Sequence, residues 1–133
     1  MLVYEHEEAI RSIAPNFAVL GQCKQYIMVT APACQPNGSS VLNPHGLAIQ
    51  PEAVDFVSRF FCPNDVVPED PVTGSAHCTA APYWSEVLGK PKLLAFQASK
   101  RGGLLQLEVI GSEPVEISGP AVVFANGVPQ VAQ

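Results

Sequence analysis

Residues 74–88 carry small or apolar side chains around almost the whole circumference of a helix. These side chains are Ala76, Ala80, Ala81, Tyr83, Trp84, Val87 and Leu88. Such a helix is buried on most sides, and Gly89 followed by Pro91 is typical of a helix end. Segments rich in β-branched and aromatic residues, which favour strands, lie on both sides of it. We therefore expect an α+β fold in which a mostly antiparallel, curled sheet, an open barrel, wraps around one central helix.

The other elements follow from local patterns and turn residues. Strands are predicted at residues 2–4, 26–30, 54–62, 93–99, 104–110, 115–118 and 121–125, and short helices at residues 7–13 and 16–20. Residues 32–51 contain four prolines and two glycines, a composition typical of a loop. With 133 residues in all, the chain has the length of one domain. We therefore expect residues 1–133 to form a single domain with a long loop at about 32–51.

The charge pattern restricts the partners of this chain. Only seven lysines and arginines are spread along it, and the net charge is -5. Nucleic-acid binding needs clustered basic residues, so we expect no nucleic-acid partner. Charged residues make up only 14% of the sequence. Because large exposed apolar patches are rare on monomers, this low fraction indicates that a second subunit or a further domain covers part of the surface.

The sequence gives no sign of a membrane segment, a disulfide framework or a metal site. Its first residues break their apolar run early and lack a basic leader, which predicts a cytoplasmic protein with no membrane partner. The four cysteines match no metal or disulfide spacing and are predicted to be free thiols: Cys23, Cys34, Cys62 and Cys78. The three histidines are isolated and have no paired ligand spacing: His6, His45 and His77. We therefore expect no metal.

The start of the predicted central helix is a candidate anion site. Thr73 is placed to cap this helix, and the small residues Gly74, Ser75 and Ala76 follow it. The free N–H groups and the dipole at a helix start favour a carboxylate or a phosphate. We therefore expect Thr73, Gly74, Ser75 and Ala76 to bind a small carboxylate or another small anion.

Three residues beside this helix start are candidates for catalysis, namely Asp70, Ser75 and His77. A carboxyl group and a hydroxyl next to a bound carboxylate suit proton transfer at the adjoining carbon. Each residue also has a structural interpretation. Asp70 could brace the turn that Pro71 begins, Ser75 could simply start the helix, and His77 could be a core histidine with satisfied hydrogen bonds.

The string Glu-Asp-Pro-Val-Thr-Gly-Ser-Ala-His at residues 69–77 resembles the hallmark of the phenazine biosynthesis-like (PhzF) family. Other motifs of that family follow the same order along the chain, at residues 55–61, 82–84, 88–90, 97–103 and 117–123. The resemblance covers nearly the whole chain. Several separated motifs in the right order are much more specific than a single glycine pattern.

The resemblance implies a fold related to diaminopimelate epimerase, in which two similar domains enclose the active site between them. Members of the family are cofactor-independent isomerases or epimerase-like proteins. By this likeness Asp70 corresponds to the acidic site residue and Ser75 to the site serine. Gly74, Ser75 and Ala76 would form the anion-binding helix start, and His77 is common in this subgroup.

The chain also departs from the family pattern. Family enzymes are about twice as long, and their first domain supplies a catalytic glutamate in an Asn-Leu-Ser-Glu type motif, which is absent here together with the Gly-Asn-Pro segment. The chain therefore resembles the second domain alone. We expect an isomerase-type domain that acts on or binds a small carboxylate. It would complete its site as a homodimer or with a separately encoded first-domain partner, and alone it would have weak or no activity.

Two other functions remain open at this point. The domain could be a non-catalytic anion-binding or structural module that pairs with itself or with a partner subunit. It could also be a thiol enzyme that uses Cys78 beside His77. Adjacent residues on a helix point about 100° apart, which makes this pair a poor nucleophile and base and disfavours the thiol enzyme.

Overall fold

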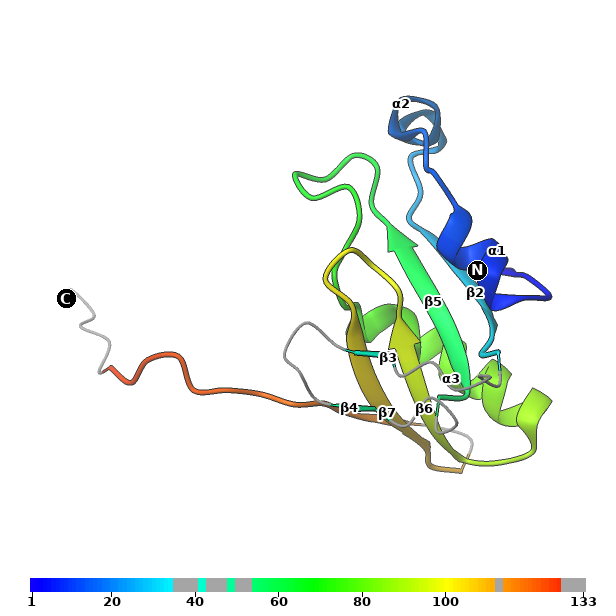
Figure 1. The fold of residues 1–133 in the computed structure, drawn as a ribbon, viewed down its shortest axis with the longest axis vertical. Coiled ribbons are helices and arrows are strands. Elements are labelled where there is room, and N and C mark those ends of the chain that lie inside the picture. The colour runs from blue at the N-terminus through cyan, green and yellow to red at the C-terminus, as the bar shows by residue number, and fades with distance from the viewer. Residues whose placement is uncertain (35–40, 43–47, 50–53, 112–113, 128–133) are drawn as a thin grey trace.

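A six-stranded sheet with one long helix on one face forms the body of the protein (Figure 1). The computed structural model describes residues 1–34, 41–42, 48–49, 54–111 and 114–127. The strand order is β1-β2-β5-β6-β7-β8. The bounds are Leu2–Val3 for β1, Ile27–Pro32 for β2, Phe56–Phe61 for β5, Lys92–Gln97 for β6, Gly103–Val109 for β7 and Val115–Ser118 for β8.

The sheet is mixed and is not closed. β1 runs parallel to β2 and β5 runs parallel to β6, whereas the other neighbouring pairs are antiparallel. A separate antiparallel pair joins β3, Val41–Leu42, to β4, Ala48–Ile49. This pair lies within the predicted loop at 32–51, whose remaining residues from 35 on fall outside the described part of the chain.

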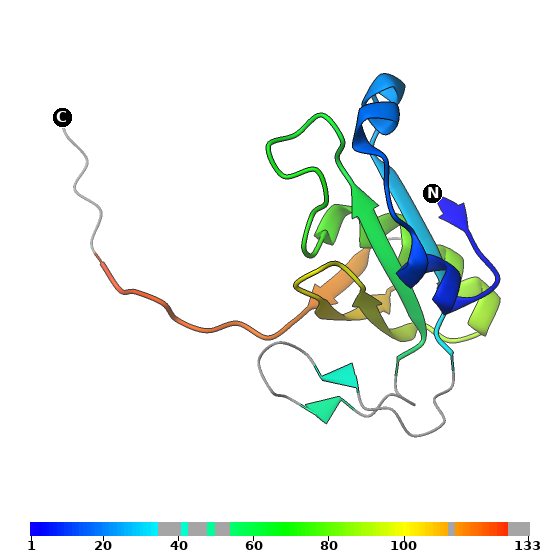
Figure 2. The same ribbon diagram turned by 45° about the horizontal axis from the view of Figure 1, so that its top comes forward.

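Side chains alternate between two cores, one on each face of the sheet. On β5, Phe56 packs in the core under the long helix α3. Its neighbour Val57 packs in the opposite core, which also contains Ile10 of helix α1. The sheet is therefore covered on one face by α3, Gly74–Leu88, and on the other by α1, Glu7–Ser12 (Figures 1 and 2).

The predicted helices are confirmed. α1 begins with two glutamates, and their negative charge suits the helix start. α2, Phe17–Leu20, begins after Asn16, whose side chain accepts a hydrogen bond from the N–H of Val19, and it continues into a 3₁₀ turn, Gly21–Cys23. None of the helices in the described part of the chain is long and apolar enough to cross a membrane.

Helix α3 has the predicted bounds, but it is not buried on most sides. Its inner face consists of Ala76, His77, Ala80, Ala81 and Trp84. The Trp84 ring stacks on Phe56 at 5.4 Å between centroids, and its indole N–H donates to Thr30 Oγ1 over 3.0 Å. The outer face is exposed, because the open sheet covers only one side of the helix.

Most of the predicted strands are confirmed, whereas the strand predicted at 121–125 is not formed. Residues 119–127 have no regular secondary structure and are exposed. Figures 1 and 2 show this segment leaving the body directly after β8. The prediction failed because no neighbouring strand lies beside these residues in the described structure, and a strand needs such a neighbour for its backbone hydrogen bonds.

Candidate functional site

A tight turn at residues 70–73 leads into α3, and Thr73 occupies the N-cap position. Thr73 does not cap the helix as the sequence predicted. Its hydroxyl instead donates to Asp70 Oδ2 over 2.5 Å, and its side chain makes no capping hydrogen bond. The first N–H groups of any helix have no acceptor within that helix. In α3 the Thr73 side chain does not supply one either.

Gln97, at the end of β6, holds this turn in place. Its side chain is fully buried. The amide nitrogen donates to the Asp70 carbonyl over 2.7 Å and lies 3.2 Å from Thr73 Oγ1, while the amide oxygen accepts from the Thr73 N–H over 2.8 Å. One side chain from a distant strand thus fixes both ends of the turn.

The segment after β6 packs closely against the same turn. Ser99 donates its hydroxyl to the Pro71 carbonyl over 2.7 Å. Gly103 approaches Val72 so closely that a Cβ on this glycine would lie 2.2 Å from Val72 Cγ2. A side chain at this position would overlap Val72 unless the Val72 side chain or the turn shifted.

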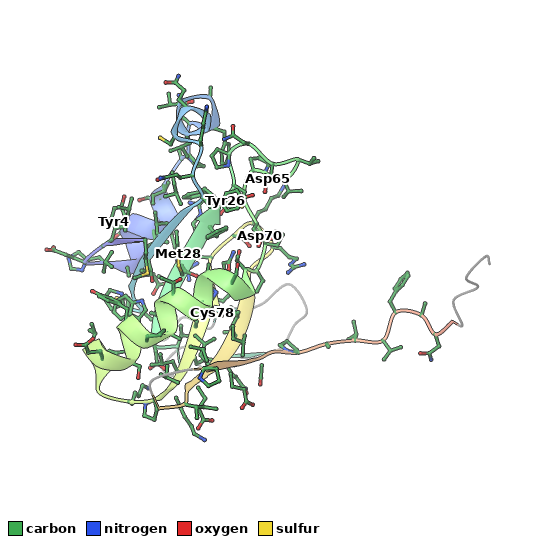
Figure 3. All side chains as sticks on the ribbon, turned by 180° about the vertical axis from the view of Figure 1, so that it is seen from behind. Tyr4, Tyr26, Met28, Asp65, Asp70 and Cys78 are labelled. Atoms are coloured by element: carbon green, nitrogen blue, oxygen red, sulfur yellow. The ribbon has the colours of Figure 1, made fainter. Side chains whose placement is uncertain are left out.

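An open pocket of about 660 Å³ lies at the start of α3. Its lining residues are Tyr26, Phe60, Cys62, Asn64, Asp65, Val66, Val67, Asp70, Thr73 and Ser75. Figure 3 shows Tyr26, Asp65 and Asp70 together on this side of the molecule. The lining includes two carboxylates and no lysine or arginine. The pocket therefore combines the N–H groups of a helix start with negative side chains.

Burial and hydrogen bonding change the titration of two groups in this pocket. The Tyr26 hydroxyl donates to Asp65 Oδ1 over 3.4 Å, and this contact raises the pKa of Tyr26 above its ordinary value. Burial raises the pKa of the Cys62 thiol, and the nearby carboxylates of Asp65 and Asp70 raise it further. Cys62 is therefore held as the neutral thiol, a weak nucleophile.

His77 lies beneath the helix start, where its side chain is fully buried and stacks against Phe56. The Thr73 carbonyl, 2.7 Å from Nδ1, can only accept, so Nδ1 carries the proton. Burial lowers the pKa of His77, although the bond to Thr73 opposes this effect. The neutral ring then accepts a hydrogen bond at Nε2 from the Ser58 hydroxyl over 3.2 Å. Both ring nitrogens are therefore engaged inside the protein.

Glu69, next to Asp70 in the sequence, is engaged by Arg59. The Nε and Nη2 atoms of Arg59 donate to the two Glu69 oxygens over 2.7 and 3.0 Å. The third guanidinium nitrogen of Arg59 donates to the carbonyls of Ile10 and Ile13. A partly buried, bidentate pair of this kind is a structural brace, and it leaves no free oxygen pair on Glu69 for a ligand.

The structure thus brings some of the predicted site residues together and separates others. Asp70, Thr73 and Ser75 line one pocket, with Gly74 exposed beside them, whereas Ala76 is buried. Cys78 is exposed and His77 is buried, so the two do not form a nucleophile and base pair.

All four cysteines are free, as predicted. Within the part of the chain that the structure describes, no group of histidine, cysteine and acidic side chains could hold a metal ion. His45 lies outside the described residues.

The sequence interpretation missed three residues of this region. Tyr26 and Asp65 are 39 residues apart, and no local pattern connects them. Gln97 belongs to a motif that the family resemblance includes, but the sequence alone gave it no role. A lone glutamine directly after the apolar run at residues 93–96 was the available signal.

Comparison with known proteins gives consistent matches. The family described as Phenazine biosynthesis-like protein (PhzC-PhzF) matches residues 1–127. A Pseudomonas aeruginosa protein named an uncharacterized isomerase is 42% identical over 128 residues, which is 96% of this chain and 42% of that protein. A Homo sapiens phenazine biosynthesis-like domain-containing protein is 49% identical over 78 residues, which is 59% of this chain and 27% of that protein.

A solved structure agrees with these matches. It is the crystal structure of a PhzC/PhzF phenazine biosynthesis protein from Clostridium difficile, which is 40% identical and matches with a TM-score of 0.73. The match covers 98% of this chain and 44% of the C. difficile chain. The chain spans less than half the length of these relatives. Because the family match extends over almost the whole chain and the fold agrees, the protein belongs to the PhzC-PhzF family of phenazine biosynthesis-like proteins.

Proposed function

We propose that the pocket at the start of α3 binds a small molecule that carries a carboxylate beside a cationic group, in its simplest form a 2-amino acid. The observation that carries this proposal is the composition of the pocket, in which Ser75 and the helix start lie with Asp65 and Asp70. The N–H groups and the Ser75 hydroxyl would hold the carboxylate. A bare anion would be repelled by the two aspartates, whereas an ammonium group would be attracted to them.

The chemistry proposed for this site is isomerisation by proton transfer at the carbon next to the carboxylate, with Asp70 as one proton carrier. Such a reaction needs one group to remove a proton and another to deliver one. Glu69 and His77 are poor second carriers because both are engaged in internal hydrogen bonds. Absence of one general acid or base costs a factor of about 10²–10⁴ in rate. The chain alone is therefore expected to react slowly.

Binding is tested by titrating the ¹⁵N-labelled protein with alanine and with propionate, which differ only in the amino group. Both should shift the amide resonances of Gly74, Ser75 and Ala76, and alanine should bind more tightly. In the Asp70→Asn variant the advantage of alanine should shrink. Equal binding of the two ligands by the wild-type protein, or shifts elsewhere only, would contradict the proposed ligand class.

Chemistry is tested by incubating the protein with 2-amino acids and unsaturated carboxylic acids in D₂O. Proton abstraction would place deuterium on the carbon beside the carboxylate. Any slow incorporation should be lost in Asp70→Asn and kept in Glu116→Gln, which changes an exposed carboxylate on β8. Rapid incorporation that depended on Asp70 would mean that the chain alone is a competent isomerase. Binding without any incorporation would leave an anion-binding module.

A further inference from the structure

The pocket at the start of α3 is lined by two chemically different groups of residues. The head group proposed above, a carboxylate beside an ammonium, uses only the polar group, which includes Ser75 and Asp70. The other group is mainly apolar, and we call it the apolar wall. It consists of Tyr26, Phe60, Cys62, Val66 and Val67. The apolar wall is therefore available for the remainder of the ligand.

The aromatic part of the apolar wall is held in place by contacts within the protein. The rings of Tyr26 and Phe60 pack edge to face with 5.9 Å between their centroids. The Tyr26 hydroxyl donates to Asp65 Oδ1, and Figure 3 shows Tyr26 on the same side of the molecule as Asp65 and Asp70. Tyr26 nevertheless remains 62% exposed. Much of its ring is thus open to a ligand.

The two valines of the apolar wall lie in the loop between β5 and α3. The base of this loop is fixed, because the Cys62 N–H donates to the Pro68 carbonyl over 2.8 Å. Val66 is fully exposed and Val67 is 55% exposed, and neither belongs to the two cores of the described structure. Loops of this kind are usually built from polar and turn-forming residues. Exposed apolar side chains at the rim of a pocket are instead typical of a ligand-binding surface.

We propose that the ligand of this pocket is a 2-amino acid with a large apolar side chain, such as leucine, and that the apolar wall selects that side chain. This inference rests on the proposed function, because Ser75, the helix start and Asp70 must hold the carboxylate and the ammonium of the ligand. A second carboxylate on the ligand is disfavoured, because the described lining residues include two aspartates and no lysine or arginine.

A basic side chain on the ligand is a weaker alternative. Its second ammonium group could pair with Asp65, but Asp65 is exposed and already accepts from Tyr26. An exposed ion pair changes an affinity by at most about fivefold. The three carbons that leucine has beyond alanine change it by about fiftyfold when they are fully buried. The pocket is open, so we expect about tenfold, which still exceeds the effect of the ion pair.

The test compares leucine with asparagine, which has the same branched shape but a polar side chain, in titrations of the ¹⁵N-labelled chain. Leucine should bind about tenfold more tightly than alanine, and asparagine should bind within about threefold of alanine. Leucine should also shift the amide resonances of Val66 and Val67, in addition to those of Gly74 and Ser75. Glutamate and lysine complete the series and should both bind more weakly than leucine.

A double variant, Val66→Ser with Val67→Ser, tests the role of the apolar wall without disturbing a core. It should reduce the preference for leucine over alanine to about threefold or less, while the affinity for alanine stays the same. Val87→Ser is the matched control, because Val87 is also 55% exposed but lies on α3 outside the lining of this pocket. This control should keep the full preference.

The possible failures are distinguishable. Equal affinities for leucine and asparagine, with alanine still shifting Gly74 and Ser75, would overturn this inference and leave the proposed function intact. Tighter binding of glutamate or lysine than of leucine would overturn it in favour of a charged side chain. An undiminished preference for leucine in the double variant would also overturn it. If none of the amino acids shifted Gly74, Ser75 or Ala76, the proposed function would fall and this inference with it.

Discussion

Strand β5 and the exposed segment at residues 119–127, which we call the tail, have similar sequences, but only β5 forms a strand. Phe56–Phe61 and residues 121–125 both contain aromatic and β-branched residues, and both are predicted to be strands. β5 lies in the middle of the sheet, antiparallel to β2 and parallel to β6, with Phe56 fully buried. The tail has no neighbour and Phe124 is fully exposed. Side-chain propensity therefore identifies a potential strand, but backbone partners decide whether the strand forms.

The largest expected effect comes from removing one phenylalanine from each region. Phe56→Ala removes a buried ring that stacks on Trp84 and His77 and should lower the free energy of unfolding by about 3–5 kcal/mol. Phe124→Ala should change it by less than about 0.5 kcal/mol, because the ring contacts only solvent. Urea unfolding of the isolated chain measures both values. A comparable loss in Phe124→Ala would mean that the tail packs against the body.

Polar side chains allow the same comparison between buried and exposed positions. Gln97→Leu leaves the Thr73 N–H and the Asp70 carbonyl without their present partners, and a buried group without a partner costs about 1–3 kcal/mol. Gln106→Leu, an exposed position on β7, is the matched control and should change stability by less than about 0.5 kcal/mol.

The Gln97 variant also tests whether the turn positions the site. Gln97→Leu should weaken alanine binding at the start of α3 more than Gln106→Leu does. Unchanged binding in Gln97→Leu would show that the turn at 70–73 holds its form without the glutamine.

The sequence predicted those features that depend on neighbouring residues. The bounds of α3 agree with the prediction because Gly89, with φ at +66°, ends the helix in the left-handed conformation. The Pro71 turn and the small residues that follow it indicated that Asp70 and Ser75 lie beside one helix start, and both line the pocket there. These features depend on local turn and cap chemistry, which a single sequence displays.

Features that depend on contacts between distant residues could not be predicted from the sequence. The Tyr26–Asp65 contact joins residues 39 positions apart, and the bonds from Gln97 to Thr73 and Asp70 span 24 and 27 positions. The open side of α3 was missed for a different reason. An apolar helix surface indicates that something covers it, but it does not tell whether the cover belongs to the same sheet or to another polypeptide.

A smaller effect is expected from pH, because burial lowers the pKa of His77 below its ordinary value of 6.5. Above that value the ring is neutral in the folded and unfolded chains alike. As the pH falls below it, the unfolded chain takes up a proton that the folded protein does not, so stability is lost. The slope approaches about 1.4 kcal/mol per pH unit. His77→Gln should remove this part of the slope, whereas His6→Gln, at an exposed position, should keep it. Equal slopes in wild type and His77→Gln would contradict the burial of a neutral ring.

The smallest change in stability is expected at Ser75, which is exposed at the helix start and is proposed to bind the ligand rather than to stabilise the fold. Ser75→Ala should alter the free energy of unfolding by less than about 0.5 kcal/mol. Loss of a hydroxyl that donates to a charged carboxylate costs about 1.5–3 kcal/mol, so the dissociation constant for alanine should rise by about tenfold or more. Thr79→Ala, exposed further along α3, is the matched control and should leave binding unchanged. A Ser75→Ala variant that bound alanine as tightly as the wild type would remove the hydroxyl from the proposed site and leave the helix N–H groups as the remaining carboxylate donors.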